Sequence, residues 1–286
     1  MAIEWYPGHM TAAMRRMEKD LPLVDLVIEL LDARIPISSK NPKLDSLVKG
    51  KKKIIVLNKA DLADPKLTEE WVKVLKKKYE FVIPMDSRSK KGMTEVKKAA
   101  GIVLQEKRER DKKKGIAARP IKTMIAGIPN VGKSTFINSF VGKVTAKTGN
   151  KPGVTRGNQW IRISQDLNLL DTPGVLWPKF DDQAVGYKLA SYGAIADHVF
   201  DEGDVAFTAI GYMKKYYCNA LSERYKIENV SEMDNLAILT QIGINKKLLK
   251  KGAEVDFSRA SHMLLEDLRS GRLGRISLDD PFEQED

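Results

Sequence analysis

The sequence predicts an α/β fold, in which a mostly parallel β-sheet is covered by helices on both faces, joined to a separate all-α domain. Over residues 1–178, short runs of apolar and β-branched residues alternate with helical patterns, which is typical of parallel sheets. From residue 179 onward, helical periods continue without clear strands. We therefore expect one domain over residues 1–178, a helical domain over 179–278, and an acidic, disordered tail over 279–286.

Buried strands are predicted where apolar residues run together with little polar interruption. They are residues 23–31, 53–57, 81–84, 121–126, 160–163 and 167–170. Helices are predicted where apolar residues recur every three or four positions. They are residues 11–20, 65–79, 93–110, 135–141, 184–194, 204–225, 231–242 and 258–269. Pro65 suits the first turn of its helix, and Gly243 and Gly252 are expected helix stops.

The composition is that of an ordinary globular protein and excludes several classes. Of the 286 residues, 42% are hydrophobic and 30% are charged. The single cysteine, Cys218, excludes an intramolecular disulfide framework. No apolar run approaches the ~20 residues of a membrane span, and the first residues do not form a secretory signal. We therefore expect a cytoplasmic protein without a membrane partner.

The positive charge is concentrated in the first part of the chain. Residues 1–177 contain 35 basic and 19 acidic side chains, whereas residues 178–286 contain 14 and 19. Such a field attracts a polyanion, so nucleic acid is the leading partner class, although solvated surface lysines would give the same count. The charged connector at residues 107–115 is open to the same two interpretations: a solvated helix end with a linker, or a nucleic-acid contact.

A glycine-rich loop at residues 127–135 fits the phosphate-binding pattern G-x-x-x-x-G-K-[ST] and lies between a predicted strand and a helix. Its backbone N–H groups and the helix N-terminus can bind phosphates. Lys133 is expected to reach the β- and γ-phosphates, and the Ser134 hydroxyl to ligate magnesium. The alternative is a turn that binds nothing. The expected nucleotide contacts in this loop are Asn130, Val131, Gly132, Lys133, Ser134 and Thr135.

Two further motifs follow predicted strands. In Asp171-Thr172-Pro173-Gly174, Asp171 is expected to hold a magnesium-bound water, and the Gly174 N–H to bond the γ-phosphate. In Asn58-Lys59-Ala60-Asp61, Asp61 can accept hydrogen bonds from both guanine N–H groups, for which adenine has no equivalent. The three motifs together therefore predict a site for GTP and magnesium.

The three motifs resemble those of translation-factor-type GTPases, but the guanine motif comes first. This order, together with the Trp5-Tyr6-Pro7-Gly8-His9-Met10 opening and the Asp32-Ala33-Arg34-Ile35-Pro36 stretch, resembles the circularly permuted ribosome-assembly GTPases. The resemblance implies a P-loop GTPase domain and a helical domain that binds RNA or the ribosome. It implies GTP hydrolysis coupled to the large (50S) ribosomal subunit precursor and its rRNA in late assembly, with no DNA partner.

The same resemblance assigns roles to further residues. Asp86 and Ser87 take the place of a base-contacting S-A-K loop, from which this sequence departs, so only backbone contacts are carried over. Thr155 takes the place of the switch threonine that ligates magnesium in the GTP state; the alternative is a turn residue. The chain leaves Gly174 directly for the helical domain, so nucleotide state could reorient that domain.

Three further positions bear on catalysis. Val175 stands where Ras-like enzymes place a glutamine that orients water, so slow intrinsic turnover is expected. His9, expected in a Pro-Gly turn, is either structural or acts on the attacking water. Asn130 either helps to coordinate a monovalent cation, potassium being the cellular candidate, or only bonds the loop backbone. The expected catalytic set is His9, Lys133, Thr155 and Gly174.

Two other functions remain open at this point. One is a GTPase switch that acts on a protein or membrane partner. The other is a nucleotide-dependent RNA-binding module whose hydrolysis is incidental. Dependence of ribosomal-subunit binding on the bound nucleotide distinguishes the ribosomal function from the switch.

Overall fold

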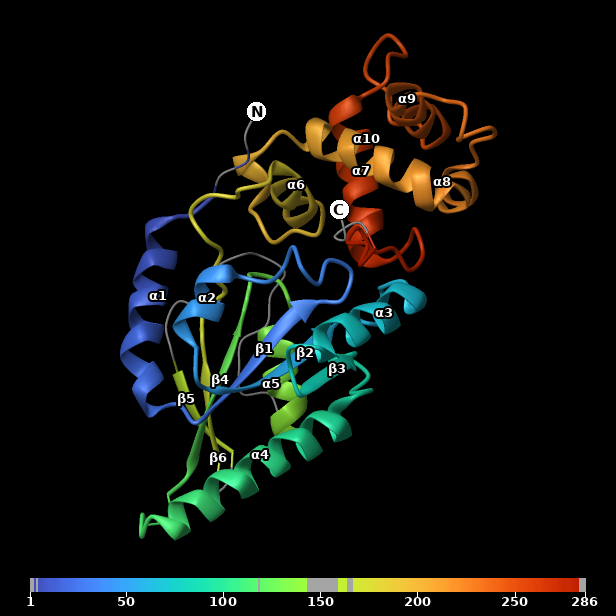
Figure 1. Cartoon of the computed structure of the whole chain (residues 1–286). Helices are drawn as coiled ribbons and strands as arrows, with labels where there is room; N and C mark the ends of the chain where they lie inside the picture. The colour runs from blue at the N-terminus through green and yellow to red at the C-terminus, as the bar shows by residue number, and fades with distance from the viewer. Residues whose placement is uncertain (1–2, 4, 118, 143–158, 164–166, 283–286) are drawn as a thin grey trace. The chain divides into compact units, whose positions relative to one another are not determined.

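The structure is a computed structural model that describes residues 3, 5–117, 119–142, 159–163 and 167–282 (Figure 1). The chain forms two compact units. The α/β unit comprises Trp5–Lys179 with Asp279–Asp286, and the helical unit comprises Met1–Glu4 with Phe180–Leu278. Among the residues that the structure describes, none of the helices could span a lipid bilayer.

A six-stranded sheet forms the centre of the α/β unit. Its strands are β1 (Leu26–Asp32), β2 (Lys52–Asn58), β3 (Phe81–Met85), β4 (Ile121–Gly127), β5 (Gln159–Arg162) and β6 (Leu167–Asp171). They lie in the order β3-β2-β1-β4-β6-β5. All neighbouring strands are parallel except β5 and β6, which form an antiparallel pair. The predicted mostly parallel sheet is confirmed.

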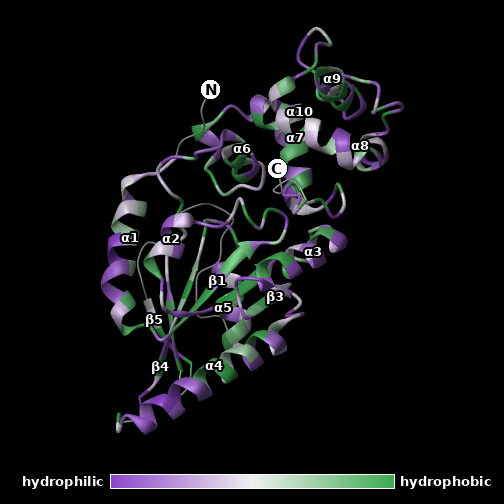
Figure 2. Cartoon of the chain, viewed as in Figure 1, coloured by the Kyte–Doolittle hydropathy of each residue, from purple (hydrophilic) through white to green (hydrophobic). Residues whose placement is uncertain are grey.

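Helices cover both faces of this sheet. They are α1 (Gly8–Asp20), α2 (Pro42–Leu47), α3 (Pro65–Lys76), α4 (Met93–Lys113) and α5 (Lys133–Val141), with a 3-10 turn, η1, at Leu21–Leu23. Trp71 and Leu75 of α3 pack in one cluster with Ile55 of β2. Alternate strand residues point to opposite faces, so Ile54 and Val56, also fully buried, face the other side, where α4 packs on β2. Figure 2 shows the apolar interior that results.

The sequence did not predict α2, because six residues are too few to show a helical period. Its start is nevertheless encoded locally. The Asn41 side chain accepts hydrogen bonds from the backbone N–H groups of Lys43 and Leu44, and Pro42 occupies the first helical position. In α4 the helix continues to Lys113, so most of the expected charged connector is helical.

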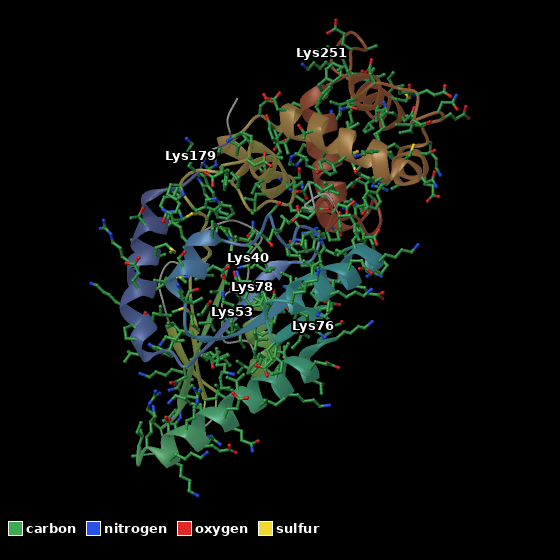
Figure 3. All side chains as sticks on the ribbon, viewed as in Figure 1. Lys40, Lys53, Lys76, Lys78, Lys179 and Lys251 are labelled. Carbon is green, nitrogen blue, oxygen red and sulfur yellow. The ribbon has the colours of Figure 1, made fainter. Side chains whose placement is uncertain are left out.

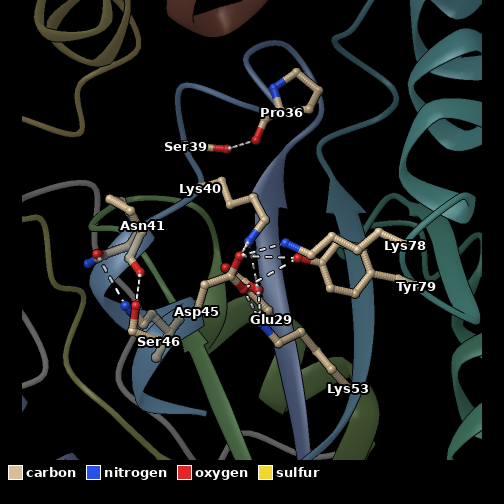
Figure 4. A network of polar contacts seen from close by, with 12 residues as sticks. Glu29, Pro36, Ser39, Lys40, Asn41, Asp45, Ser46, Lys53, Lys78 and Tyr79 are labelled. Atoms are coloured by element: carbon tan, nitrogen blue, oxygen red, sulfur yellow. Dashed lines mark hydrogen bonds and ion pairs between the residues drawn. The ribbon is translucent and has the colours of Figure 1, made fainter. Parts of the chain in front are cut away.

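A largely buried polar cluster links α2 and the segment just after α3 to the sheet (Figure 4). Glu29 of β1 is 1% exposed, and Lys53 of β2 lies 3.0 Å from its Oε2. Lys53 and Lys40 both contact Asp45 of α2, to which the Tyr79 hydroxyl donates at 3.2 Å. Burial alone would raise the pKa of Asp45, but the two lysines hold it well below its usual range. The lysines and carboxylates thus compensate one another inside the fold.

The helical unit is all-α in its described residues, as predicted. It contains α6 (Gln183–Ser191), η2 (Asp197–Val199), α7 (Glu202–Tyr216), α8 (Cys218–Tyr225), α9 (Asn235–Asn245) and α10 (Phe257–Ser270). The single helix expected over residues 204–225 is wrong. The chain leaves helical geometry at Tyr217, where φ is −135°, and the Tyr217 hydroxyl accepts a hydrogen bond from the Ser277 N–H at 3.2 Å.

Both ends of the chain differ from the expected domain boundaries. Ile3 is buried, and its N–H donates to Gln183 Oε1 at 2.8 Å within the helical unit. Asp279 is also buried, so a disordered tail does not begin there. Its carboxylate accepts hydrogen bonds from the backbone N–H groups of Ile37 and Ser38 and from the Ser38 hydroxyl, at 2.7–2.9 Å. Its carbonyl accepts from Trp71 Nε1 at 3.1 Å.

Candidate nucleotide-binding site

The candidate site lies where the parallel strands end. In the sheet register Asp32 pairs with Asn58, Leu30 with Gly127, and Ile125 with Asp171. The loops after β2, β4 and β6 therefore start at one edge of the sheet. The strand order reverses between β1 and β4, and ligands of open α/β sheets bind outside the carboxyl ends of strands at such a point.

The loop between β4 and α5 needs its glycines. Gly132 has φ +98°, and a Cβ there would lie 2.4 Å from Asn58 Nδ2. Gly127 has φ +153°, and a Cβ there would lie 2.6 Å from the Leu30 carbonyl oxygen. Asn130 also has a positive φ, 55°, which asparagine tolerates better than most residues. The loop leads directly into the N-terminus of α5, whose backbone N–H groups and dipole favour anions.

Lys133 is folded against this loop. The side chain is buried, and Nζ donates to the carbonyl oxygens of Gly127 at 3.0 Å and Ile128 at 2.7 Å. Burial lowers the pKa of Lys133 to about 8, while the nearby Asp171 carboxylate raises it and the Lys59 cation lowers it further. The loop therefore holds an incompletely compensated ammonium group, which a phosphate would stabilise.

Asn58 joins the guanine motif to the phosphate loop. Its side-chain amide donates to the Val131 carbonyl at 2.7 Å, and its side-chain oxygen accepts from the Ser87 hydroxyl at 2.7 Å. The Ser139 hydroxyl of α5 in turn donates to the Ser87 carbonyl. Three loops that are distant in the sequence are thus cross-linked through one buried asparagine. The sequence predicted only backbone contacts for Ser87. In the structure its side chain also supports the site, because it hydrogen-bonds to Asn58.

Lys59 is held by a carboxylate whose role the sequence did not reveal. Lys59 has φ +60°, and its Nζ lies 2.9 Å from Asp32 Oδ2. Arg34 binds the same carboxylate through Nε and Nη2, at 2.9 and 2.8 Å. Burial alone would raise the pKa of Asp32, but Arg34 and Lys59 hold it well below its usual range. Asp32 therefore stays ionised and positions Lys59.

Asp61 and Asp86 lie on the outer side of the site. Asp61 is exposed, so its carboxylate is accessible to a base. Partial burial and then the Asp86 carboxylate raise the pKa of Asp61. The Asp86 side chain accepts hydrogen bonds from the backbone N–H groups of Arg88 and Ser89, at 2.8 and 3.3 Å, and so shapes its own loop. Asp61 is the better placed of the two to accept the guanine N–H groups.

The end of β6 brings a carboxylate to the phosphate loop. Asp171 is 4% exposed, and its Oδ1 is buried without a hydrogen-bond partner. Burial raises the pKa of Asp171, opposed by Lys133. A buried, unpartnered carboxylate oxygen fits a hard cation such as magnesium, for which the Ser134 hydroxyl at the start of α5 is a second oxygen donor. The third expected ligand, Thr155, lies outside the described residues.

Gly174 packs directly on the phosphate loop. A Cβ at Gly174 would lie 2.6 Å from both N and Cα of Pro129, so no larger residue fits there. Val175 follows and is buried; its N–H lies 3.4 Å from the Gly127 carbonyl oxygen. The segment that carries Gly174 is therefore in contact with the loop expected to bind phosphates.

His9 lies in the first turn of α1, not in the expected Pro-Gly turn. The imidazole is exposed and meets the Trp5 ring edge-on, with 6.4 Å between ring centroids. The next residue, Met10, is buried, and its sulfur lies 3.5 Å from the Leu176 N–H, two residues after Gly174. The start of α1 is thus in contact with the segment after Gly174.

A phosphate loop after β4, an Asp-x-x-Gly motif after β6 and a guanine motif after β2, on one mostly parallel sheet, define a P-loop GTPase with a circularly permuted motif order. The chain belongs to the family of ribosome biogenesis GTPase A. It is 44% identical to "Ribosome biogenesis GTPase A" of Bacillus cereus over 99% of this chain and 95% of that protein. With the protein of that name from Thermotoga maritima it shares 30% identity over 98% and 95% of the two chains.

Two further comparisons agree with this assignment. The crystal structure of GNP-bound YlqF from T. maritima is similar with a TM-score of 0.63 and 26% identity, over 94% of this chain and 98% of that one. A family described as "50S ribosome-binding GTPase" matches residues 122–237, so the guanine motif at 58–61 lies before the matched range. This protein is accordingly a GTP hydrolase.

Proposed function

We propose that this GTPase binds the precursor of the large (50S) ribosomal subunit and acts in its late assembly, with its GTP state coupled to ribosome binding. The names of its relatives and the description of the matching family support this partner. The excess of basic over acidic residues in residues 1–177 supports rRNA as the part of the partner that is contacted. Its site of action is then the cytoplasm.

The observation that carries the proposed coupling is the contact of Gly174 with Pro129. The segment after Gly174 is held elsewhere too: the Asn41 amide donates to the Val175 carbonyl at 3.1 Å. Loss of the γ-phosphate would remove one contact that holds this segment, and the segment leads within a few residues to Phe180, where the helical unit begins. We infer that the segment after Gly174 transmits the nucleotide state to the helical unit.

The proposed nucleotide contacts follow the motifs. Lys133, Val131, Gly132 and Thr135 bind the phosphates, the Gly174 N–H bonds the γ-phosphate, and Asp61 selects guanine with Asn58, Lys59, Asp86 and Ser87 around it. Ser134, Asp171 and Thr155 would hold magnesium. When bound, the ion neutralises charge that develops on the transferred phosphoryl group.

Activation of water is proposed to require the partner. Val175 is apolar and buried, so it cannot orient water. The exposed His9 is the proposed acid–base group, brought over the γ-phosphate when the ribosomal precursor docks. Asn130 is proposed to help hold a potassium ion beside the phosphates, which supplies positive charge during hydrolysis.

Co-sedimentation tests this function. The protein is mixed with purified large-subunit precursors, and with small subunits as the control, in the presence of a GTP analogue or GDP. We expect it to sediment with the large precursor and more strongly with the GTP analogue. Equal binding to both subunits, or binding that ignores the nucleotide, would contradict the proposal.

A further inference from the structure

The segment from Arg88 to Lys114, which comprises the loop before α4 and α4 itself, carries a strong positive charge. It contains eleven basic and four acidic residues, and the structure describes all of it. A charged helix is often only a solvated surface. A solvated surface and a binding surface differ in how far the acidic residues neutralise the basic ones, so the partners of the four carboxylates are informative.

Three of the four carboxylates are engaged within the protein. Glu106 lies 2.9 Å from Nζ of Lys52 on β2. Asp111 forms an ion pair with Lys107, one turn earlier in the helix. Glu109 accepts a hydrogen bond from Gln105 Nε2 at 3.1 Å. Two of the four negative charges are therefore compensated by lysines, and the eleven basic residues leave the segment with a net positive charge toward solvent.

The basic side chains lie away from the packed face of the helix. Val96, Ala99 and Val103 are buried against the sheet side, whereas Lys98, Lys112 and Lys113 are exposed. Nitrogen-tipped side chains project along α4 in Figure 3, and Figure 2 shows that its C-terminal end is hydrophilic. Ile102 is the one large apolar side chain that residues 88–114 expose strongly.

The C-terminal end of α4 is fixed to the α/β unit and is not a loose tail. Asp25, just before β1, accepts hydrogen bonds from both terminal nitrogens of Arg119, at 2.8 and 2.7 Å, and from the Lys122 N–H at 3.1 Å. Lys107 of α4 lies 3.7 Å from the same carboxylate. The basic surface is therefore held in place before any partner binds, which lowers the entropy cost of binding.

We propose that this surface, defined as the exposed basic side chains of residues 88–114, binds the phosphate backbone of double-stranded RNA. The proposal rests on the proposed function and names the surface by which the α/β unit contacts the subunit. A 21-residue helix is ~32 Å long, which spans several consecutive phosphates. A protein partner would call for apolar or aromatic anchors, and the exposed side of this segment offers only Ile102.

The test uses two matched charge reversals in the full-length protein. The first variant carries Lys98→Glu, Lys112→Glu and Lys113→Glu. The control carries Lys66→Glu, Lys76→Glu and Lys77→Glu, which are exposed positions on and just after α3 with the same change in charge. All six side chains are exposed, so both variants should fold. Binding is measured with large-subunit precursors and with protein-free duplex RNA over a range of salt concentrations, and GTP-analogue affinity is measured alongside.

We expect the first variant to bind both the precursor and duplex RNA at least about tenfold more weakly. The slope of the logarithm of the association constant against the logarithm of the salt concentration should correspond to roughly two to three fewer phosphate contacts. GTP-analogue affinity should be unchanged, and the control should bind like the unaltered protein. Equal binding by the two variants would overturn the proposal. A loss of precursor binding with unchanged duplex binding would overturn it in favour of a ribosomal protein. Failure of the unaltered protein to bind precursors would instead refute the proposed function, while the duplex measurement still tests the surface.

Discussion

The Nζ atom of Lys133 lies 2.7 Å from the carbonyl oxygen of Ile128, so this lysine donates a hydrogen bond within the phosphate loop itself. Burial lowers the pKa of this ammonium to about 8. The group must be charged to bind a triphosphate, and it is only partly charged in mildly alkaline solution. Nucleotide affinity therefore depends on pH in a range where an ordinary lysine would not titrate.

We predict that the association constant for GTP is nearly flat from about pH 7 to about pH 8 and falls above it. The bound triphosphate raises the pKa of Lys133. Above about pH 8 the free protein has lost the Lys133 proton, so GTP binding must take up a proton. The association constant then falls by up to about tenfold per pH unit. Calorimetry in buffers of different ionisation enthalpy measures that proton. Lys133→Met should bind more weakly and lose this pH dependence; an unchanged pH profile in the variant would contradict the assignment.

Asp61→Asn should shift base preference from guanine toward xanthine, because the amide places a donor where guanine needs an acceptor. The loss for GTP should be several kcal/mol in order of magnitude, given ~1.5–3 for each charge-assisted hydrogen bond. Competition binding with GTP and XTP measures it. Asp64→Asn is the control, since the Asp64 side chain caps α3 and asparagine can accept the same backbone hydrogen bonds. Unchanged GTP affinity in Asp61→Asn would refute guanine selection by this motif.

Potassium should raise the GTPase rate over sodium at equal ionic strength, and Asn130→Gly should abolish the difference. Glycine is the better replacement because φ is +55° at this position, which alanine adopts only with strain. The comparison therefore removes the side chain and keeps the loop conformation. Equal rates in the two salts with the unaltered protein would leave Asn130 a structural residue.

The fold and the motifs could be predicted because their signals are local. A β-branched run followed by glycines and Lys133 fixes a strand, a loop and a helix start in one stretch of sequence. The tertiary contacts were not predictable in this way. The ionised Asp32 binds Lys59, which lies 27 positions later in the sequence. The Asn58 amide donates to Val131, which lies 73 positions later. Their residue types are visible in the sequence, but the partner of each depends on strand order.

The predicted domain boundaries at the two ends of the chain were wrong for a related reason. An acidic C-terminal sequence is typical of a solvated tail, but the Asp279 carboxylate is buried and meets hydrogen-bond donors. Those donors are the backbone N–H groups of Ile37 and Ser38, and backbone groups leave no signal in sequence composition. Likewise, Ile3 groups with the helical unit, where its N–H donates to Gln183, a contact that no local pattern predicts.

His9→Ala should bind GTP and the large-subunit precursor normally and lose most of the turnover that the precursor stimulates, by ~10²–10⁴-fold. Lys133, Ser134 and Asp61 still hold the nucleotide in this variant. His198→Ala and His262→Ala are the matched controls and should keep full stimulated turnover. Weak binding by His9→Ala would indicate a structural histidine at the start of α1. Full stimulated turnover would leave a cation or a group of the rRNA to position the water.

GTP hydrolysis should depend on the large-subunit precursor, because Val175 cannot orient the attacking water. The most direct measurement is the steady-state rate of GTP hydrolysis by the full-length protein alone, with purified large-subunit precursors, and with small subunits. We predict slow turnover alone and with small subunits, and a saturable increase of at least about 10²-fold with the large-subunit precursor. An equal rate in all three conditions would contradict it.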